Sequence, residues 1–343
     1  MDDGVAQLAA VIAADLATWD TPWVELAIYE TGDGRAIAEE IDAFCRRELG
    51  GGVARGLFHS ASVGAVTGVE LGDGRRVVVK AHQPERELSW LQEIVRVQMH
   101  LASRGLPATT VCGGPAPIGR GLAIVEAFVE GGATPDGHAP AVRAAIAEGL
   151  CAIVAAGRGL VAGSTLKPQL LGTPPAIRGL WPTPHSKLFD FSQPVPWIDD
   201  VARAARARFV PAGELVIGHG DWRAEHVRFD GGRIVGAFDW DSLCKEYEPS
   251  LVGFTAHAFA CDWSRTPPAP VPTLDEARAF VADYERARGR GFTVEERRLC
   301  GATFAFSCAY VARCAWGLGN DERGSEGTVQ QLLASQGPTL MEL

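Results

Sequence analysis

The chain has 343 residues, 47% of them hydrophobic and 22% charged, a composition that supports a large buried core and excludes a disordered protein. A formal net charge of −10 argues against a broad basic surface, so we expect no nucleic-acid partner. Two aspartates follow Met1 where a signal peptide would have basic and apolar segments. We therefore expect a cytoplasmic protein without membrane association and with its 8 cysteines reduced.

The first 130 residues predict helices followed by short strands. Apolar residues recur at helical spacing as far as the run Gly50 to Gly52, and beyond it apolar positions alternate between turns. The expected helices are 3–18, 35–48 and 87–103, and the expected strands are 63–69, 75–80, 109–112 and 122–129.

The rest of the chain is mainly helical in pattern. We expect helices at 139–156, 199–209, 250–261, 274–288 and 294–318, and a compact strand-and-loop region at 214–240. A β-rich half followed by a helical half predicts an α+β fold with two lobes. We expect a helical extension at 1–50, a small β-rich N-lobe with one helix at 51–130, and a larger, mainly helical C-lobe at 131–343.

The segment 214–241 contains the side chains that can do chemistry. An apolar strand leads into a polar loop, and a short strand then turns at 230–233 into a second apolar strand that ends in two aspartates. Because hairpin strands return the chain on itself, we expect the polar ends of this segment to meet. The side chains that would share one site are His219, Asp221, His226, Asp239 and Asp241.

This set of side chains suits phosphoryl transfer. The reaction needs a carboxylate to orient the attacking hydroxyl and accept its proton, and it needs ligands that hold a metal ion against the triphosphate. Asp221 is placed for the first role, and Asp239 and His226 for the second. Asp241 either assists the metal ion or substrate or caps the next element.

The same residues carry a family resemblance. His219-Gly220-Asp221 and Phe238-Asp239-Trp240 are similar to the H-G-D-x-x-x-x-N and apolar-D-W/F signatures of the aminoglycoside phosphotransferase and choline kinase superfamily. The resemblance implies a bilobal protein-kinase-like fold and a small-molecule kinase that uses ATP or GTP with Mg²⁺. It also implies Asp221 as catalytic base, Asp239 as principal metal ligand and His219 as a brace for the loop.

One position departs from the family signature. His226 stands where the family has a metal-binding asparagine, and the single asparagine of the chain is Asn320. Histidine favours softer ions than Mg²⁺, so three alternatives stay open: an active kinase, a weak or Mn²⁺-preferring kinase, and an inactive nucleotide binder. A metal-dependent hydrolase is a further alternative, but it leaves Lys80 unexplained.

The N-lobe supplies the expected nucleotide-binding residues. Lys80 ends an apolar strand and is one of only four lysines in a chain that has 28 arginines, and a compact ammonium suits the α- and β-phosphates. A surface lysine at a strand end is the alternative. Glu93, in the following helix, is the expected partner of Lys80, with Glu87 as the second choice.

The remaining N-lobe expectations rest on position. Ser60 and Ser62 lie in a loop, 59–68, that lacks a complete G-x-G-x-x-G pattern and would cover the phosphates, unless it is a plain hairpin turn. Glu126 and Phe128 lie where the family has the hinge between lobes, whose backbone binds the purine base.

The acceptor is not determined by the sequence. The family phosphorylates hydroxyls of aminoglycosides, macrolides, sugars and amino alcohols such as choline, and Trp181, His185 and the pair Asp199-Asp200 lie in the lobe that binds the acceptor. Trp222 and Trp240 either line that site or pack against the loop. The oligomeric state is equally open.

Overall fold

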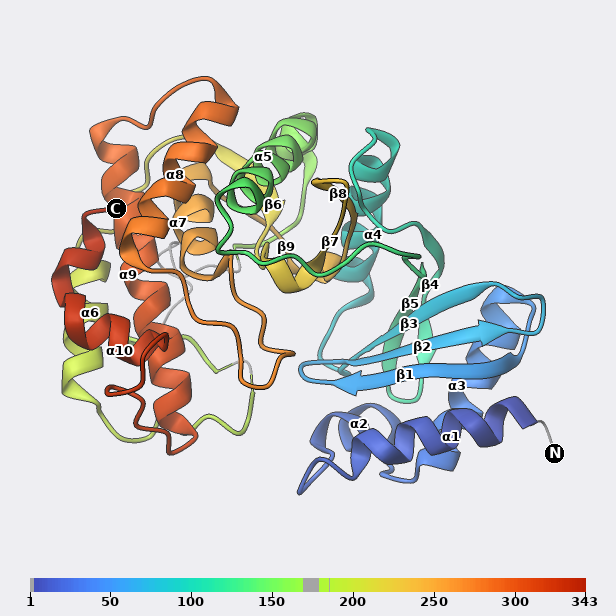
Figure 1. The fold of residues 1–343 in the computed structure, drawn as a ribbon. Coiled ribbons are helices and arrows are strands. Elements are labelled where there is room, and N and C mark those ends of the chain that lie inside the picture. The colour runs from blue at the N-terminus through green and yellow to red at the C-terminus, as the bar shows by residue number, and fades with distance from the viewer. Residues whose placement is uncertain (1–2, 169–178, 185) are drawn as a thin grey trace. The chain divides into compact units, whose positions relative to one another are not determined.

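A computed structural model describes residues 3–168, 179–184 and 186–343. The chain divides into two compact units, Met1–Ser103 with Ala108–Glu130, and Arg104–Pro107 with Gly131–Leu343. In Figure 1 the first unit runs from blue to teal and holds an antiparallel sheet with four helices. We call it the N-lobe, and the second unit, which is mainly helical, the C-lobe.

The N-lobe sheet has five antiparallel strands in the order β1-β2-β3-β5-β4. Sequence analysis missed β1 and treated its last residues as part of a loop. Register shifts near Arg55 and Phe58 interrupt the period-two alternation by which a strand is recognised. The strands are β1 (Val53–Ala61), β2 (Ala65–Leu71), β3 (Arg76–His82), β4 (Val111–Ile118) and β5 (Gly121–Ala127).

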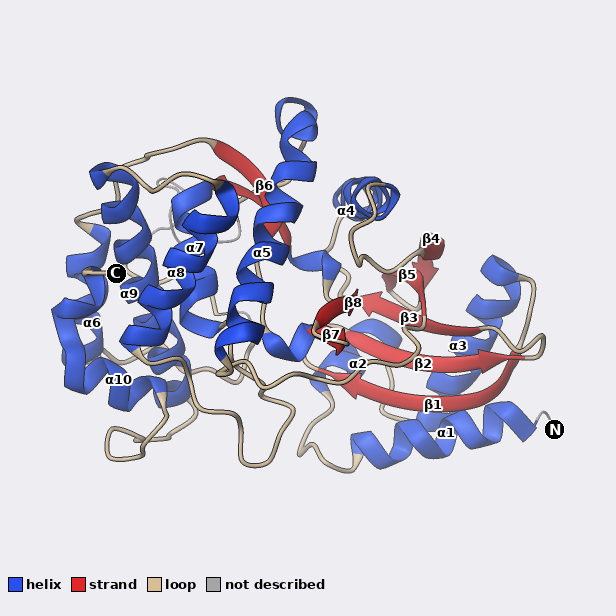
Figure 2. Ribbon diagram, turned by 45° about the horizontal axis from the view of Figure 1, so that its top comes forward, coloured by secondary structure: helices blue, strands red, loops and turns tan. Residues whose placement is uncertain are grey.

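The helices of the N-terminal extension complete the N-lobe core. Three helices, α1 (Asp3–Leu16), α2 (Trp23–Tyr29) and α3 (Gly34–Leu49), lie along one face of the sheet, as Figure 2 shows for α1 and α3. Their buried residues share one hydrophobic cluster with Val77 and Val79 of β3. The extension is therefore an integral layer, although α2 was too short for its periodicity to be recognised.

Helix α4 (Leu88–Ser103) covers the opposite face of the sheet. The register places Glu126 directly across from Val78, on the face that does not pack against the extension. The Gln98 side chain of α4 donates to the Glu126 carboxylate at 2.9 Å. Helices thus pack on both faces of the sheet.

The C-lobe consists of helices with two short two-stranded sheets, which confirms the predicted α+β fold. Sequence analysis missed β9, because its five residues include two charged ones, and the short helix α10. The helices are α5 (Pro140–Gly157), α6 (Pro196–Arg206), α7 (Glu248–Ala258), α8 (Leu274–Arg288), α9 (Val294–Gly317) and α10 (Val329–Gln336). The paired strands are β6 (Leu215–His219) with β9 (Leu243–Tyr247), and β7 (Val227–Asp230) with β8 (Arg233–Ala237).

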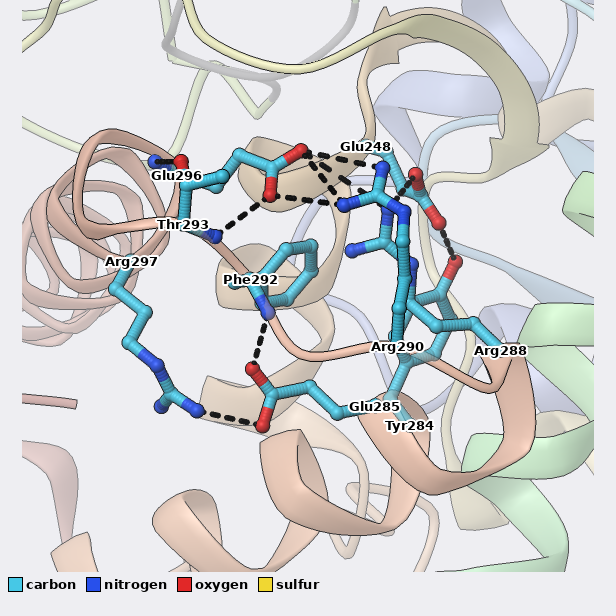
Figure 3. A network of polar contacts seen from close by, with 9 residues as sticks. All are labelled: Glu248, Tyr284, Glu285, Arg288, Arg290, Phe292, Thr293, Glu296 and Arg297. Carbon is cyan, nitrogen blue, oxygen red and sulfur yellow. Dashed lines mark hydrogen bonds and ion pairs between the residues drawn. The ribbon is translucent and has the colours of Figure 1, made fainter.

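A buried polar network joins α7, α8 and α9 (Figure 3). Glu248, the first residue of α7, accepts hydrogen bonds at 2.8 Å from Tyr284 and from Arg288. Glu296 lies 4.0 Å from Arg288 and also closes a capping box with Thr293 at the start of α9. Because α7 directly follows β9, the network fixes the base of the β6–β9 pair.

Helix α5 is strongly apolar. Among the described residues, Pro140–Gly163 is the one helical stretch that is long and apolar enough to span a membrane, a test that core helices of soluble proteins also pass. Ile146, Leu150 and Ile153 of this helix are fully buried, and it packs against α8 and β6.

Candidate active site

The β7–β8 hairpin brings the predicted polar residues together. Val227 pairs with Ala237, and the Phe238 amide donates to the His226 carbonyl at 2.9 Å, so the two ends of the hairpin meet. One ligand atom from each of Asp221, His226 and Asp239 then lies within 4.8 Å of the other two. We call these three residues the catalytic cluster. Asp241 lies on the next turn and is not a member of this group.

His219 holds the two sides of the catalytic cluster in place. Its Nε2–H donates to the Phe238 carbonyl at 2.8 Å, and its Nδ1 accepts the Asp221 amide at 3.1 Å. These bonds require the neutral ring. Burial lowers the pKa of His219 to about 4, so the ring is neutral at physiological pH. His219 is therefore placed as the predicted brace and positions the residues that carry the chemistry.

Two indoles surround this brace. Trp222 and Trp240 are almost completely buried and contact the edge of the His219 ring, with centroid distances of 5.4 and 5.2 Å. Their Nε1 atoms donate to the carbonyls of Ile146 and Ala237. Of the two alternatives for these tryptophans, packing against the loop is the one that their burial supports.

Hydrogen bonds hold the side chains of His226 and Asp239. Nδ1–H of His226 donates to the Asp221 carbonyl at 2.8 Å, and Nδ1 lies 3.7 Å from Oδ2 of Asp221, so Nε2 is the nitrogen that can bind an ion when the ring is neutral. Asp239 has a left-handed backbone, with φ 60°, and its Oδ2 accepts the Ser242 hydroxyl at 2.7 Å. Such backbone strain in a non-glycine residue is frequent at functional sites.

Sequence analysis missed Arg223, which pairs directly with Asp221. Its Nε also donates to Glu225 at 3.0 Å, and its guanidinium lies 4.4 Å from the centre of the Trp263 ring. Burial opposes its charge, but the carboxylates of Asp221 and Glu225 outweigh that effect and raise the pKa of Arg223. The sequence does place an arginine two residues after Asp221. The family signature leaves that position unspecified, so nothing in the signature indicated a role for it.

In the N-lobe, Lys80 and Ser60 share one face of the sheet. Ser60 pairs with Val66, which in turn pairs with Lys80, so the three form one row across β1, β2 and β3. Directly paired residues project to the same side of a sheet. Lys80 is buried, with 6% exposure, whereas Ser60 and Ser62 are exposed at the end of the β1–β2 hairpin.

Glu93 lies in α4, the helix that covers the face of the sheet on which Lys80 lies. Its carboxylate is buried and accepts two hydrogen bonds from Arg96, at 2.7 and 2.8 Å. The contact with Lys80 that the sequence predicts remains a prediction. The second candidate, Glu87, precedes the helix and is exposed.

The predicted hinge residues lie partly within the sheet. Glu126 is a residue of β5, paired with Val78 on one side and Val111 on the other, and its side chain is buried. The Phe128 amide already donates to the Arg76 carbonyl at 3.1 Å. The Phe128 amide is therefore bonded within the lobe, and the binding of a purine base by the hinge backbone remains a prediction.

Sequence analysis named Phe128 but missed Phe58, its aromatic neighbour in the N-lobe. The rings of Phe58 and Phe128 have centroids 6.4 Å apart, and Phe58 is 36% exposed. Phe58 pairs with Gly68, and a Cβ at Gly68 would lie 2.3 Å from the Phe58 ring. Glycine at that position therefore lets the ring lie over the sheet, on the face to which Lys80 belongs.

The expected acceptor-site residues of the C-lobe have structural partners. Trp181 donates to Asp199 at 3.0 Å, and Asp199 also accepts the amide of Val195. Asp200 is exposed and pairs with Arg203. His185 lies outside the described residues.

Comparison with known proteins identifies the family. A sequence profile of the phosphotransferase enzyme family matches residues 65–292, which is more than half of the chain. The chain belongs to this family. The predicted family relationship is confirmed, and the protein is a small-molecule phosphotransferase. No curated protein matches the sequence.

Solved structures of this class share the fold. An amicoumacin kinase in complex with AMP-PNP, Ca²⁺ and Ami is 12% identical over 84% of this chain and 88% of its own, with a TM-score of 0.56. A type VIII aminoglycoside-3'-phosphotransferase is 17% identical over 79% and 98%, with a TM-score of 0.53. An aminoglycoside phosphotransferase from Alicyclobacillus acidocaldarius is 13% identical over 87% and 93%, with a TM-score of 0.51. The protein-kinase-like fold is therefore confirmed.

Proposed function

We propose that this phosphotransferase moves the γ-phosphoryl group of ATP or GTP to a hydroxyl of a small molecule, with Asp221 as catalytic base. The supporting observation is the catalytic cluster, in which three ligand atoms lie within 4.8 Å of one another beside a buried neutral histidine. Asp221 accepts the proton of the attacking hydroxyl, and its carboxylate orients that hydroxyl toward the phosphorus.

The donor set of the cluster fits a divalent cation. Asp239 offers a carboxylate and His226 a neutral imidazole nitrogen, held by the hydrogen bonds to Ser242 and to the Asp221 carbonyl. Such an ion would neutralise charge on the phosphates. Mixed oxygen and nitrogen ligands suit Mn²⁺ as well as Mg²⁺, so we expect activity with both ions. The ratio of activity with Mn²⁺ to activity with Mg²⁺ should be higher than in a site that has only oxygen ligands.

Arg223 places a cation beside the base. Its side chain is 13% exposed and pairs with Asp221, which is 27% exposed. A guanidinium in a partly dry site can bind the phosphoryl oxygens while Asp221 receives the proton. The pair thus explains how an aspartate and a polyanionic donor can share one site.

The N-lobe residues complete the proposed nucleotide site. Lys80 would bind the α- and β-phosphates with Glu93 as its partner, and the hydroxyls of Ser60 and Ser62 would bind the terminal phosphates. The exposed pair of Phe58 and Phe128 offers ring faces on which a purine can stack. Shared membership of one sheet face by Lys80, Ser60 and Phe58 supports this assignment.

The acceptor class is narrowed by charge. Asp221, Glu225 and Asp239 act on the Arg223 guanidinium, and Glu225 and Asp262 act on that of Arg228, so four carboxylates accompany two arginines and the surroundings of the base are net acidic. An acceptor that carries an amine near its hydroxyl, such as an aminoglycoside, an amino alcohol or a macrolide with an amino sugar, fits this charge better than an uncharged sugar. One solved structure with this fold is named as an amicoumacin kinase and contains Ami together with AMP-PNP.

His226 also supports a second candidate, a nucleotide-binding protein without transferase activity. Isothermal titration of ATP and GTP, with Mg²⁺, with Mn²⁺ and with chelator, tests both. We expect metal-dependent binding that Asp239→Ala weakens at least tenfold and that Asp221→Ala changes by less than threefold. Asp230→Ala, in the exposed hairpin turn, is the matched control.

Turnover then separates the two candidates. The wild-type protein should release ADP or GDP when hydroxyl acceptors that carry amines are supplied, and Asp221→Ala should not. Metal-dependent nucleotide binding without turnover on any of these acceptor classes would favour the inactive binder. Absence of nucleotide binding under every metal condition would overturn both.

A further inference from the structure

A second cluster of potential metal ligands lies in the N-lobe. Asp15 of α1, Glu25 of α2 and His59 of β1 each place one ligand atom within 4.8 Å of the other two. Glu25 is 1% exposed and His59 is 7% exposed. We call these residues the N-terminal cluster. All three precede residue 65, where the match to the phosphotransferase family begins.

His59 is oriented as a metal ligand would be. Its Nδ1 lies 2.8 Å from the hydroxyl of Thr67, a fully buried residue of β2, and its Nε2 lies 3.2 Å from Oε1 of Glu25. When Nδ1–H donates to Thr67, the Nε2 lone pair faces the carboxylates. A second hydrogen bond of this kind fixes the ring of nearly every histidine that binds a metal ion.

The carboxylates of the cluster need a positive charge. Oδ2 of Asp15 is inaccessible to solvent and has no hydrogen-bond partner among the described residues. The Glu25 carboxylate, which is almost completely buried, lies beside it. Two carboxylates that share a buried site must bind either a proton or a cation, because uncompensated like charges in such a site are unstable.

We propose that the N-terminal cluster is a structural site for a divalent transition cation, Zn²⁺ or Mn²⁺, bound by Asp15, Glu25 and Nε2 of His59. Ligand atoms of a tetrahedral zinc ion lie roughly 3.3 Å apart, because each bond is about 2.0–2.2 Å long. The separation of 3.2 Å between His59 and Glu25 matches that spacing. Asp15 is the least buried of the three ligands.

The site would join two consecutive helices to a strand that is more distant in sequence. Its ligands come from α1, α2 and β1, so a bound ion fastens the helical extension to the sheet. His59 directly precedes Ser60, the residue proposed to bind phosphate. The ion therefore stabilises the strand that carries the phosphate-binding hairpin, a role that goes beyond phosphoryl transfer.

The test uses the full chain in a background that lacks the catalytic cluster. Asp239→Ala removes one ligand there and leaves the N-terminal cluster intact. After chelation, we expect this variant to bind about one equivalent of Zn²⁺ or Mn²⁺ by isothermal titration, without nucleotide, and Zn²⁺ should raise its Tm. With Co²⁺ as a probe, absorption bands typical of nitrogen and oxygen ligands should appear.

Substitutions within the cluster should abolish this binding. In the Asp239→Ala background, Glu25→Gln should no longer bind the equivalent of Zn²⁺ or Mn²⁺. The Co²⁺ bands and the rise in Tm should also disappear. Asp15→Asn changes the least buried ligand and is therefore the substitution least prone to unfold the protein. It should lower the affinity for the metal ion at least tenfold. Thr67→Val should weaken binding by roughly 10–100-fold through the loss of His59 orientation.

The control is His100→Gln, a substitution of a partly exposed histidine in the same lobe, which should bind as the background does. Circular dichroism of each metal-free variant verifies that it is folded. The proposal is wrong if the Asp239→Ala protein takes up no transition cation. It is equally wrong if Glu25→Gln and Asp15→Asn, both folded, bind the ion as tightly as the background.

Discussion

The catalytic cluster and the N-terminal cluster contain the same side chains, two carboxylates and one imidazole, in different structural settings. The catalytic cluster lies in loops at the ends of short strands, its members are partly exposed, and Asp239 has a left-handed backbone. The N-terminal cluster lies on two helices and a strand, and Glu25 and His59 are buried. A site that turns over substrate needs access and tolerates strain, whereas a site that fastens elements together gains from burial.

The sharpest way to separate the two clusters is to remove the catalytic base. Asp221→Asn keeps the shape of the side chain but cannot accept the proton, so we expect kcat to fall by about 10²–10⁴-fold with nucleotide affinity changed by less than threefold. Steady-state kinetics with an accepted hydroxyl substrate measure this. Asp230→Asn in the exposed turn should retain wild-type kcat. A kcat for Asp221→Asn within tenfold of wild type would contradict the assignment.

A matched substitution in the N-terminal cluster should have the opposite profile. Glu25→Gln replaces a buried carboxylate that lies 3.2 Å from Nε2 of His59, and loss of a hydrogen bond to a buried charged group costs about 1.5–3 kcal/mol of unfolding free energy. Because Glu25 is outside the catalytic cluster, kcat should stay within twofold of wild type. Urea unfolding of the N-lobe and steady-state kinetics test the two expectations together. A lower kcat with an unchanged free energy of unfolding would show that Glu25 contributes to catalysis rather than to stability, which contradicts its assignment.

Acid should weaken the lobe that holds the catalytic cluster. Burial lowers the pKa of His219 and of His257 to about 4, below the value near 6.5 of an exposed histidine. Between pH 6.5 and 4 the unfolded chain binds more protons than the folded one. The stabilisation is therefore complete above pH 6.5 and is lost as the pH falls toward 4, by up to about 3 kcal/mol for each residue.

The variant His257→Gln tests this effect at a buried histidine that is not a member of the catalytic cluster, although the charges of Asp221 and Arg223 act on it. Denaturant unfolding at pH 7.0 and pH 5.0 should give a smaller difference in free energy for His257→Gln than for wild type. The exposed substitution Asp230→Asn should leave the wild-type difference unchanged. Equal pH dependence in wild type and His257→Gln would mean that the buried imidazole does not contribute.

Much of the fold was predictable because its signals are local. Helix α4 has apolar residues at helical spacing, whereas α9 has a long apolar run whose start is marked by Thr293 with Glu296. Strand β1 was missed because its bulges break the alternation, and β9 because Lys245 and Glu246 lie within a five-residue strand. The partner of β9 is β6, about thirty residues away in sequence, and no local pattern encodes that pairing.

The catalytic cluster was predictable for the same reason, and the N-terminal cluster was not. A glycine turn places His226 opposite Phe238, so the hairpin pattern in the sequence predicts that its two ends meet. Asp15, Glu25 and His59 belong to three separate elements, and only tertiary packing brings them together. Arg223 was within reach of sequence reasoning, since it follows Asp221 by two residues, but its pairing depends on a side-chain rotamer.

The smallest expected effect concerns the nucleotide base. Stacking of a base on an aromatic ring is worth about 1–3 kcal/mol, so Phe58→Ala should raise the Kd for ATP roughly tenfold while kcat at saturation stays within twofold. Isothermal titration and saturation kinetics measure the two effects separately. Met99→Ala, at an exposed apolar residue of the same lobe, is the matched control. If Phe58→Ala instead lowered kcat and left Kd unchanged, the ring would act on the phosphate-binding hairpin rather than on the base. The conclusion that exposed groups bind substrate would then hold for the catalytic cluster but not for the exposed aromatic residue of the N-lobe.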